Sequence, residues 1–279
     1  MVSLRGAVVE VERRLTAAGV PLPRVDAELL VAHAVGTSRT ALYADGSRAL
    51  TGPEGDHLEA LLARREAREP LAYVLGAWGF RRLTLKVDRR VLVPRPETEV
   101  VVERCLARLR DHAEPEVLDV GVGSGAIALA VADEHPGARV TAFDVSPGAL
   151  AVASENAHRC GLAGRVRLVE HDLTSGFGEA RWHLVVSNPP YVDPDDIGNL
   201  EPEVRDWEPR EALVGVGATE GVARAAFSAL RPGAWLVLEV ADGEAEQVAG
   251  LLETLGYADV KRTRDLTARE RVVEGRRPR

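Results

Sequence analysis

The chain has 279 residues, 46% hydrophobic and 28% charged, and carries a formal net charge of −8. This composition is typical of a globular protein with one large domain or two of ordinary size, and it excludes a disordered or membrane-embedded chain. No apolar run approaches the roughly 20 residues of a membrane-spanning helix, and the first residues lack the apolar stretch of a signal peptide. We therefore expect a cytoplasmic protein.

The helical part comes first. Residues 1–78 show apolar spacing typical of helices, with start signals at Asp26, at Ser38 and at Thr51, where Glu54 completes a capping box. These patterns predict a small helical bundle.

A change of pattern follows in residues 79–93, where apolar residues alternate with basic ones around residues 87–89. The alternation predicts a short β-hairpin that links two domains. Its basic side chains form either a contact face for a partner or a solvated edge protected by charge. They are Arg81, Arg82, Lys86, Arg89 and Arg90.

Strands and helices alternate regularly from residue 94 to the end of the chain. The apolar strands are predicted at residues 117–122, 139–145, 166–171, 182–186, 234–240, 259–263 and 270–274, and the helices at 126–134, 147–160, 219–230 and 243–255. Strands separated by helices of about a dozen residues indicate right-handed βαβ crossovers. We therefore expect a doubly wound α/β domain with a mostly parallel sheet of seven strands.

One segment, residues 193–217, breaks this rhythm because it is long, acidic and punctuated by prolines. Loops of this length in a compact domain are usually functional or mobile. We expect it to become ordered around a substrate.

Charge and cysteine content narrow the function. Residues 1–93 carry a net charge of +3 and residues 94–279 a net charge of −11, so the second part would repel a nucleic-acid backbone. The two cysteines, Cys105 and Cys160, form no CxxC pair, so we expect neither a disulfide framework nor a metal site.

A glycine-rich turn follows the first strand of the α/β domain in the sequence DVGVGSG, residues 119–125. Glycines there let the backbone turn tightly and approach a ligand, although purely structural glycine turns are also common. Asp144 ends the next strand 23 residues after Gly121, where a carboxylate can accept both hydroxyls of a ribose. Asp172 and Leu173 end the third strand, where they are placed to contact an adenine ring, or Asp172 merely caps a turn. The spacing predicts an adenosine site.

The fourth strand runs into VSNPPY, residues 186–191. Two adjacent prolines cannot donate to a sheet and each fixes its own φ, so the strand stops there and leaves Asn188 on a stiff corner. A structural cap is the alternative interpretation.

These motifs together resemble S-adenosyl-L-methionine-dependent methyltransferases of the Rossmann-like class, through DVGVGSG, FDVS, HDL and SNPPY. With VPRPETE at residues 93–99, EPLAYVLG at 69–76 and EPRxAL at 208–213, the chain is similar over nearly its full length to the HemK/PrmC family. That family methylates the glutamine amide of the GGQ motif in class I peptide-chain release factors, and its helical N-terminal domain holds the protein substrate. The resemblance thus implies a substrate-recognition domain at residues 1–78, a linker at 79–93 and a methyltransferase domain at 94–279. We expect a monomer, although the sequence does not determine the oligomeric state.

The resemblance also implies the roles of individual residues, with S-adenosyl-L-methionine as cofactor and S-adenosyl-L-homocysteine as product. The catalytic residues are Asn188, Pro189 and Tyr191, and the same three residues bind the substrate together with Pro190. The residues that bind the cofactor are Gly121, Val122, Gly123, Ser124, Gly125, Asp144, Asp172, Leu173 and Asn188. Arg95 and Glu97 either line the approach to the cofactor or anchor the linker. Leu92 either contacts the substrate side chain or fills a hydrophobic position of the hairpin.

Elementary chemistry supports this assignment of the NPPY motif. A carboxamide nitrogen is a poor nucleophile because its lone pair is delocalised into the carbonyl. Asn188 Oδ1 and the Pro189 carbonyl can each accept one N–H of a planar amino group and so aim its nitrogen, while Tyr191 packs over the amide and excludes water. The motif contains no general base, so we expect the proton to leave to solvent.

Three alternatives remain open from the sequence. A glutamine of a ribosomal protein would be recognised by nearly the same motifs. An amino group of DNA or RNA would call for a basic cleft, which the acidic second part does not predict. A module that binds the cofactor without catalysis would have no need for the paired acceptors of NPPY.

Overall fold

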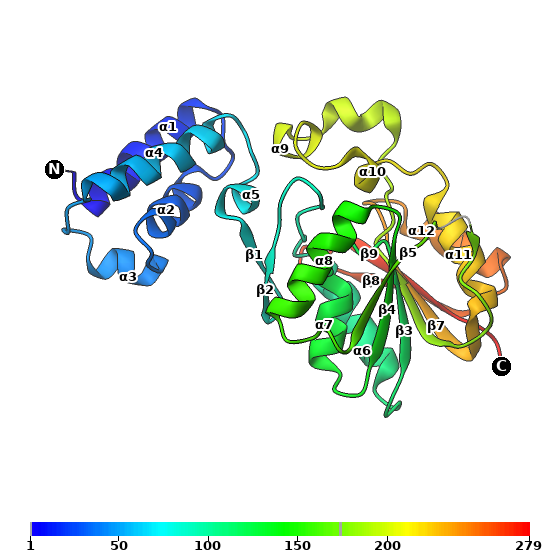
Figure 1. Cartoon of the computed structure of the whole chain (residues 1–279). Coiled ribbons are helices and arrows are strands. Elements are labelled where there is room, and N and C mark those ends of the chain that lie inside the picture. Colours follow the sequence, from blue (N-terminus) through cyan, green and yellow to red (C-terminus); the bar gives the residue numbers. More distant parts are fainter. Residues whose placement is uncertain (1, 173–174) are drawn as a thin grey trace. The chain divides into compact units, whose positions relative to one another are not determined.

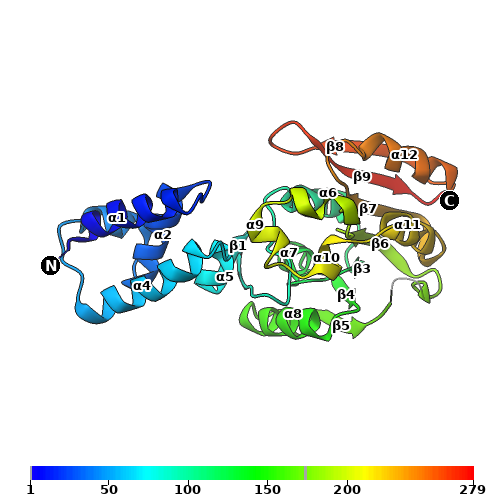
Figure 2. The same ribbon diagram turned by 90° about the horizontal axis from the view of Figure 1, so that it is seen from above.

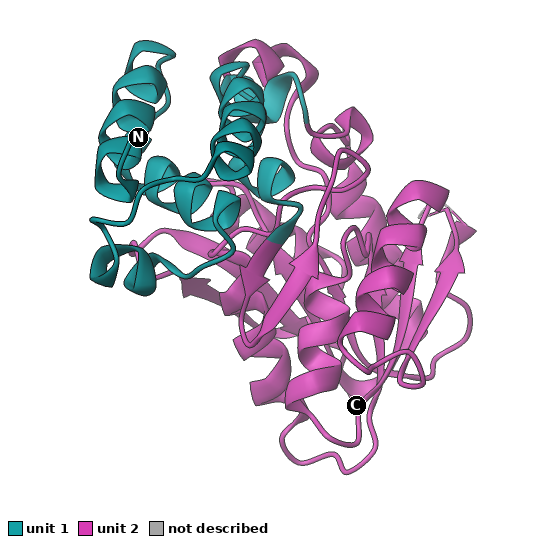
Figure 3. Cartoon of the chain, turned by 60° about the vertical axis from the view of Figure 1, so that its left-hand side comes forward, with its two compact units in different colours: residues 1–77, 201–207 teal, residues 78–200, 208–279 magenta. Residues whose placement is uncertain are grey.

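The structure is a computed structural model of the chain, described for residues 2–172 and 175–279. It divides into two compact units (Figure 3). The first comprises Met1–Ala77 and Glu201–Trp207, and the second Trp78–Leu200 and Glu208–Arg279. The polypeptide therefore passes between the units three times, and the segment of residues 79–93 falls in the second unit.

Five helices build most of the first unit: α1 (Leu4–Ala17), α2 (Pro23–Ala34), α3 (Arg39–Ala44), α4 (Gly52–Glu66) and α5 (Leu71–Leu75). Ser38 caps α3 by accepting the Ala41 N–H, and the capping box of Thr51 and Glu54 opens α4, as predicted. The start expected at Asp26 is wrong. The helix α2 already begins at Pro23, where proline fits a first turn, and Asp26 is buried within it.

Ion pairs attach α9 (Pro202–Arg205) to this unit. Arg65, with only 5% of its side chain exposed, contacts both Asp26 at 2.8 Å and Glu203 at 2.8 Å. Arg68 contacts Glu203 at 2.6 Å. Because buried charges need partners, these contacts specify where residues 201–207 dock within the unit.

The hairpin consists of β1 (Ala77–Phe80) and β2 (Leu83–Lys86). Its turn lies at residues 81–82, so the position expected around residues 87–89 is wrong by several residues. The two strands are fixed by Phe80 and Leu85, which are buried in the core of the α/β unit. Four of the five basic side chains form ion pairs within this unit, namely Arg81 with Glu134, Arg82 with Asp133, Lys86 with Glu155 and Arg90 with Asp88.

A seven-stranded sheet forms the centre of the second unit, in the order β5-β4-β3-β6-β7-β9-β8 (Figure 1). Neighbours from β5 to β7 are parallel, and β9 is antiparallel to both β7 and β8. The strands are β3 (Glu116–Val120), β4 (Arg139–Asp144), β5 (Val166–Glu170), β6 (Trp182–Ser187), β7 (Leu230–Glu239), β8 (Ala258–Arg264) and β9 (Glu270–Arg276). The predicted mostly parallel α/β fold with a preceding helical region is confirmed.

Helices cover both faces of the sheet (Figures 1 and 2). On one face lie α6 (Thr98–Leu109), α7 (Ala126–Glu134) and α8 (Pro147–Arg159), and on the other α11 (Ala218–Ala229) and α12 (Ala245–Thr254). Along the central strands β3, β4 and β6, residues on the two faces enter the two cores, as in a sheet buried on both sides. Among the described residues, no helix is long and apolar enough to cross a membrane.

The segment of residues 193–217 contains three short helices: η2 (Pro194–Asn199), α9 and α10 (Arg210–Leu213). A β-bridge between Val192 and Val214 brings its two ends together, with the Val192 N–H donating to the Leu213 carbonyl over 2.9 Å. Thus both ends of this segment lie beside the NPPY motif.

Candidate active site

The glycine turn and the NPPY motif follow neighbouring strands. In the parallel pair of β3 and β6, Val120 is in register with Ser187, so Gly121 and Asn188 come next at the same edge. The Ser187 hydroxyl donates to the Val120 carbonyl over 2.6 Å and ties the two strand ends. Chain order reverses between these strands, since β4 and β5 lie on one side of β3 and β6 and β7 on the other. Ligands of doubly wound sheets bind at this point.

The glycine turn requires glycine for steric reasons. Gly121, Gly123 and Gly125 have φ values of +82°, +53° and +87°, in the region that side chains with a Cβ avoid. At Gly125 a Cβ would also lie 2.9 Å from Leu129 Cδ1 in the following helix. The backbone conformation therefore favours glycine at all three positions, and at Gly125 the close packing against α7 requires it.

Asp144 is held at the end of β4 by backbone donors. Its Oδ2 accepts the Gly123 N–H and its Oδ1 the Ser146 N–H, both at 2.9 Å. Burial raises the pKa of Asp144, and these N–H groups oppose the rise by stabilising the carboxylate. The carboxylate is thereby placed beside the glycine turn, as the spacing predicts.

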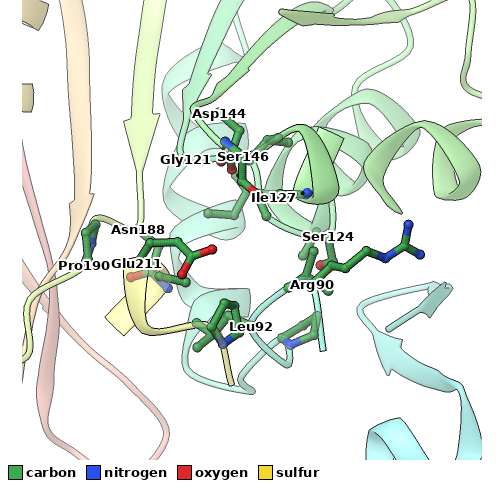
Figure 4. Close-up of a pocket in the computed structure, with 18 of the residues that line it drawn as sticks. Arg90, Leu92, Gly121, Ser124, Ile127, Asp144, Ser146, Asn188, Pro190 and Glu211 are labelled. Carbon is green, nitrogen blue, oxygen red and sulfur yellow. Dashed lines mark hydrogen bonds between the residues drawn. The ribbon is translucent and has the colours of Figure 1, made fainter. Parts of the chain in front are cut away.

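An open cavity lies at this edge of the sheet (Figure 4). The predicted residues that line it are Gly121, Val122, Gly123, Ser124, Asp144, Asn188 and Pro190. The cavity thus brings together the two motifs that the sequence singled out separately.

The other predicted residues lie elsewhere. Gly125 and Pro189 are buried behind the lining. Tyr191 lines a neighbouring depression together with Gly215; burial, with a smaller contribution from the Glu239 carboxylate, raises the pKa of Tyr191 to about 12, so its phenol is neutral. Asp172 is exposed and is not part of the cavity lining, and Leu173 lies outside the described residues.

Residues of VPRPETE and EPRxAL meet at the cavity. Arg95 lines it and donates through Nη2 to both carboxylate oxygens of Glu208 at 2.7 Å. Burial raises the pKa of Glu208, and Arg95 opposes the rise. Arg95 therefore lies in the cavity wall and is tied to the residue before Pro209, while Glu97 is the residue that precedes α6. Leu92 also lines the cavity.

Two supporting residues were missed by the sequence reasoning. Asn156, fully buried in α8, donates through Nδ2 to the carbonyls of Ser124 at 2.8 Å and Lys86 at 3.0 Å and accepts the Lys86 N–H. It ties the hairpin to the glycine turn, and a polar residue among the apolar positions of a helix was the available signal. Asp119 is also buried, and its Oδ2 accepts the Ala128 N–H at 3.0 Å at the start of α7.

The fold, the glycine turn and the NPPY corner together define a methyltransferase of the S-adenosylmethionine-dependent class. A solved structure of a methyltransferase from Pyrococcus furiosus, 20% identical, supports the fold with a TM-score of 0.50, covering 71% of this chain and 90% of that one. In the described part of the chain, no group of three or more His, Cys, Asp or Glu side chains is arranged to hold a metal ion.

Sequence comparison specifies the family. The family model of the PrmC N-terminal domain matches residues 7–76, and that of the methyltransferase small domain matches residues 99–200. The release factor glutamine methyltransferase of Caulobacter vibrioides is 40% identical over 266 residues, 94% of this chain and 92% of its own. That of Geobacter sulfurreducens is 42% identical over 264 residues, 92% and 91% of the two chains. The chain belongs to the release factor glutamine methyltransferase family, which confirms the resemblance seen in its motifs.

Proposed function

We propose that this enzyme methylates the side-chain amide nitrogen of the glutamine in the GGQ motif of class I peptide-chain release factors. The observation that carries the proposal is the position of Asn188 and Pro190 in the same cavity as the glycine turn, at the ends of neighbouring strands. An amide acceptor thus lies beside a nucleotide-type turn, in a chain of this family.

The residues of the cavity fit S-adenosylmethionine. At Gly121 and Gly123 the turn offers backbone without side chains, and Asp144 offers carboxylate oxygens to ribose hydroxyls. When bound, the cofactor supplies an electrophilic methyl group on a sulfonium. The cavity must also admit the substrate side chain, which we place near Leu92 and Asn188.

The NPPY motif orients the nucleophile. Asn188 Oδ1 and the Pro189 carbonyl each accept one N–H of the glutamine amide, which turns the nitrogen toward the cavity. The adjacent prolines hold both acceptors in place without reorganisation during the reaction. Tyr191, whose phenol is neutral, lines the depression beside the cavity. In this proposal its ring packs over the planar amide once the substrate is bound and excludes water, and the proton leaves to solvent after transfer.

The first unit supplies substrate recognition in this proposal, with residues 1–78 as the recognition domain, 79–93 as the linker and 94–279 as the methyltransferase domain. Because the net charge of −11 in residues 94–279 repels phosphate backbones, the enzyme contacts the release factor directly and has no nucleic-acid target. It acts as a monomer in the cytoplasm, where release factors work.

The test is transfer of labelled methyl groups to a purified release factor, followed by mass spectrometry of the GGQ peptide. We expect Asn188→Ala to lower the rate by roughly 10³-fold, because one of two orienting acceptors is lost. The control Asn199→Ala makes the same change at an exposed asparagine and should retain full activity.

Two results would contradict the proposal. Undiminished transfer by Asn188→Ala would remove this side chain from the mechanism. Labelling of a ribosomal-protein glutamine or of nucleic acid, without labelling of the release factor, would replace the substrate.

A further inference from the structure

Four charged side chains line the cofactor cavity: Arg90, Arg95, Asp144 and Glu211. Both arginines are already neutralised by carboxylates that do not line it. Arg90 contacts Asp88 at 2.6 Å, and Arg95 contacts Glu208 at 2.7 Å. Within the part of the chain that the structure describes, no cation pairs with Asp144 or Glu211, so two negative charges of the lining are left without a counterion.

These two carboxylates face the same space from different elements. Asp144 ends β4, whereas Glu211 stands in the first turn of α10, between the lining residues Pro209 and Ala212. Figure 4 shows Glu211 on the side of the cavity where Asn188 lies. The negative charge of Glu211 raises the pKa of Asp144, in addition to the larger effect of burial.

The position of Glu211 matters because of where the transferred methyl group has to be. If Asn188 holds the substrate amide, the methyl group and the sulfonium that carries it must lie on the Asn188 side of the cavity, where Figure 4 also places Glu211. The carboxylate of Glu211 is solvent-exposed and can adjust to a cation there.

We propose that Glu211 is a specificity-determining residue that favours the cationic cofactor over its spent, neutral product. This inference rests on the proposed function for the location of the methyl group. In the reaction the bond between sulfur and methyl carbon breaks, its electron pair stays on sulfur, and a bond between the amide nitrogen and the methyl carbon forms. The sulfonium becomes a neutral thioether, and the positive charge passes with the methyl group to the nitrogen, which releases a proton.

The attraction between Glu211 and the ligand is therefore present before the reaction and absent after it. S-adenosylmethionine carries a net charge of +1, from its sulfonium, its ammonium and its carboxylate, whereas S-adenosylhomocysteine is neutral overall. A carboxylate on the cavity wall consequently strengthens binding of the fresh cofactor and lets the product dissociate.

The test is calorimetric titration of both ligands into the wild-type enzyme and Glu211→Gln, without any release factor. We expect the Kd of S-adenosylmethionine to rise roughly 3- to 10-fold, as for loss of one partly solvated charge contact, and the Kd of S-adenosylhomocysteine to change less than about 2-fold. Raising the ionic strength should shrink the effect.

The matched control is Glu253→Gln, which removes the same charge from an exposed position of α12 that lines none of the cavities described above. It should leave both dissociation constants unchanged, and unliganded thermal unfolding should show that Glu211→Gln folds like the wild type. Equal weakening of both ligands, or no weakening of either, would overturn the inference. The titration contains no protein substrate. A failure of the proposed function would therefore appear in the methylation assay, and a failure of this inference in the titration.

Discussion

Gly215 provides a sharp test of the role of the NPPY corner. It lies just after α10 and packs directly against Pro190. A Cβ added to it would lie 2.5 Å from Pro190 Cγ and 2.8 Å from the Pro190 carbonyl oxygen. Ala218 Cβ would lie 3.0 Å away on another side. The substitution Gly215→Ala therefore has no free direction in which to place its methyl group.

The size of the effect follows from these distances. The new methyl group would stand about 1 Å inside ordinary van der Waals contact with Pro190, and one of the two atoms is backbone, so the corner itself must move. Overpacking of this kind costs about 1–3 kcal/mol of stability. A misplacement of about 1 Å in an orienting group lowers a rate by up to roughly 100-fold.

The assay compares Gly215→Ala with Gly217→Ala. Gly217 has a φ of +74° and nothing within 4 Å of an added Cβ, so its substitution costs about 1–2 kcal/mol through backbone strain alone. Denaturant unfolding measures both losses of stability, and single-turnover methyl transfer measures the chemical step. We expect only Gly215→Ala to slow transfer, by roughly 10- to 100-fold.

Two outcomes would refute the reasoning. A wild-type transfer rate in Gly215→Ala would show that the position of Pro190 does not matter for catalysis. An equal loss of rate in Gly217→Ala would show that the rate follows the stiffness of the loop and not the place of the proline.

Two further predictions concern charges outside the cavity lining. Burial raises the pKa of Asp119 to about 8, so its stabilising contribution is present below its ordinary pKa and is lost as pH rises toward 8. The free energy of unfolding of Asp119→Asn, measured in urea, should therefore rise relative to that of the wild type by about 1.4 kcal/mol per pH unit between about pH 5 and pH 7, and the difference should level off above about pH 8. If the two proteins lose stability in parallel with pH, this pKa is contradicted. Glu203→Gln should destabilise the first unit by about 1–3 kcal/mol, because Arg65 and Arg68 lose a partly buried charged partner. The control Glu201→Gln changes a side chain that is 69% exposed and should cost less than about 0.5 kcal/mol. Equal losses of stability for the two variants in denaturant unfolding would contradict this expectation.

The sequence alone determined the architecture of the α/β unit and the place of its site. Strand-like apolar runs alternate along the chain with segments that have the apolar spacing of helices. Because crossovers are right-handed and connections are short, this order of elements restricts the sheet to a few topologies. The glycine turn after β3 and the NPPY corner after β6 are local signals, and parallel strands bring their carboxyl ends to one edge. Their meeting in one cavity could therefore be predicted without coordinates.

Only the tertiary structure decided which residues support that site. Asn156 contacts Lys86 across 70 positions of sequence, and Gly215 faces Pro190 from the far end of an irregular segment. The same holds for Glu211, whose cavity position depends on the short helix α10. Turn chemistry, caps and periodicity act over a few residues, whereas these contacts depend on how separate elements pack, so no local pattern in the chain specifies them.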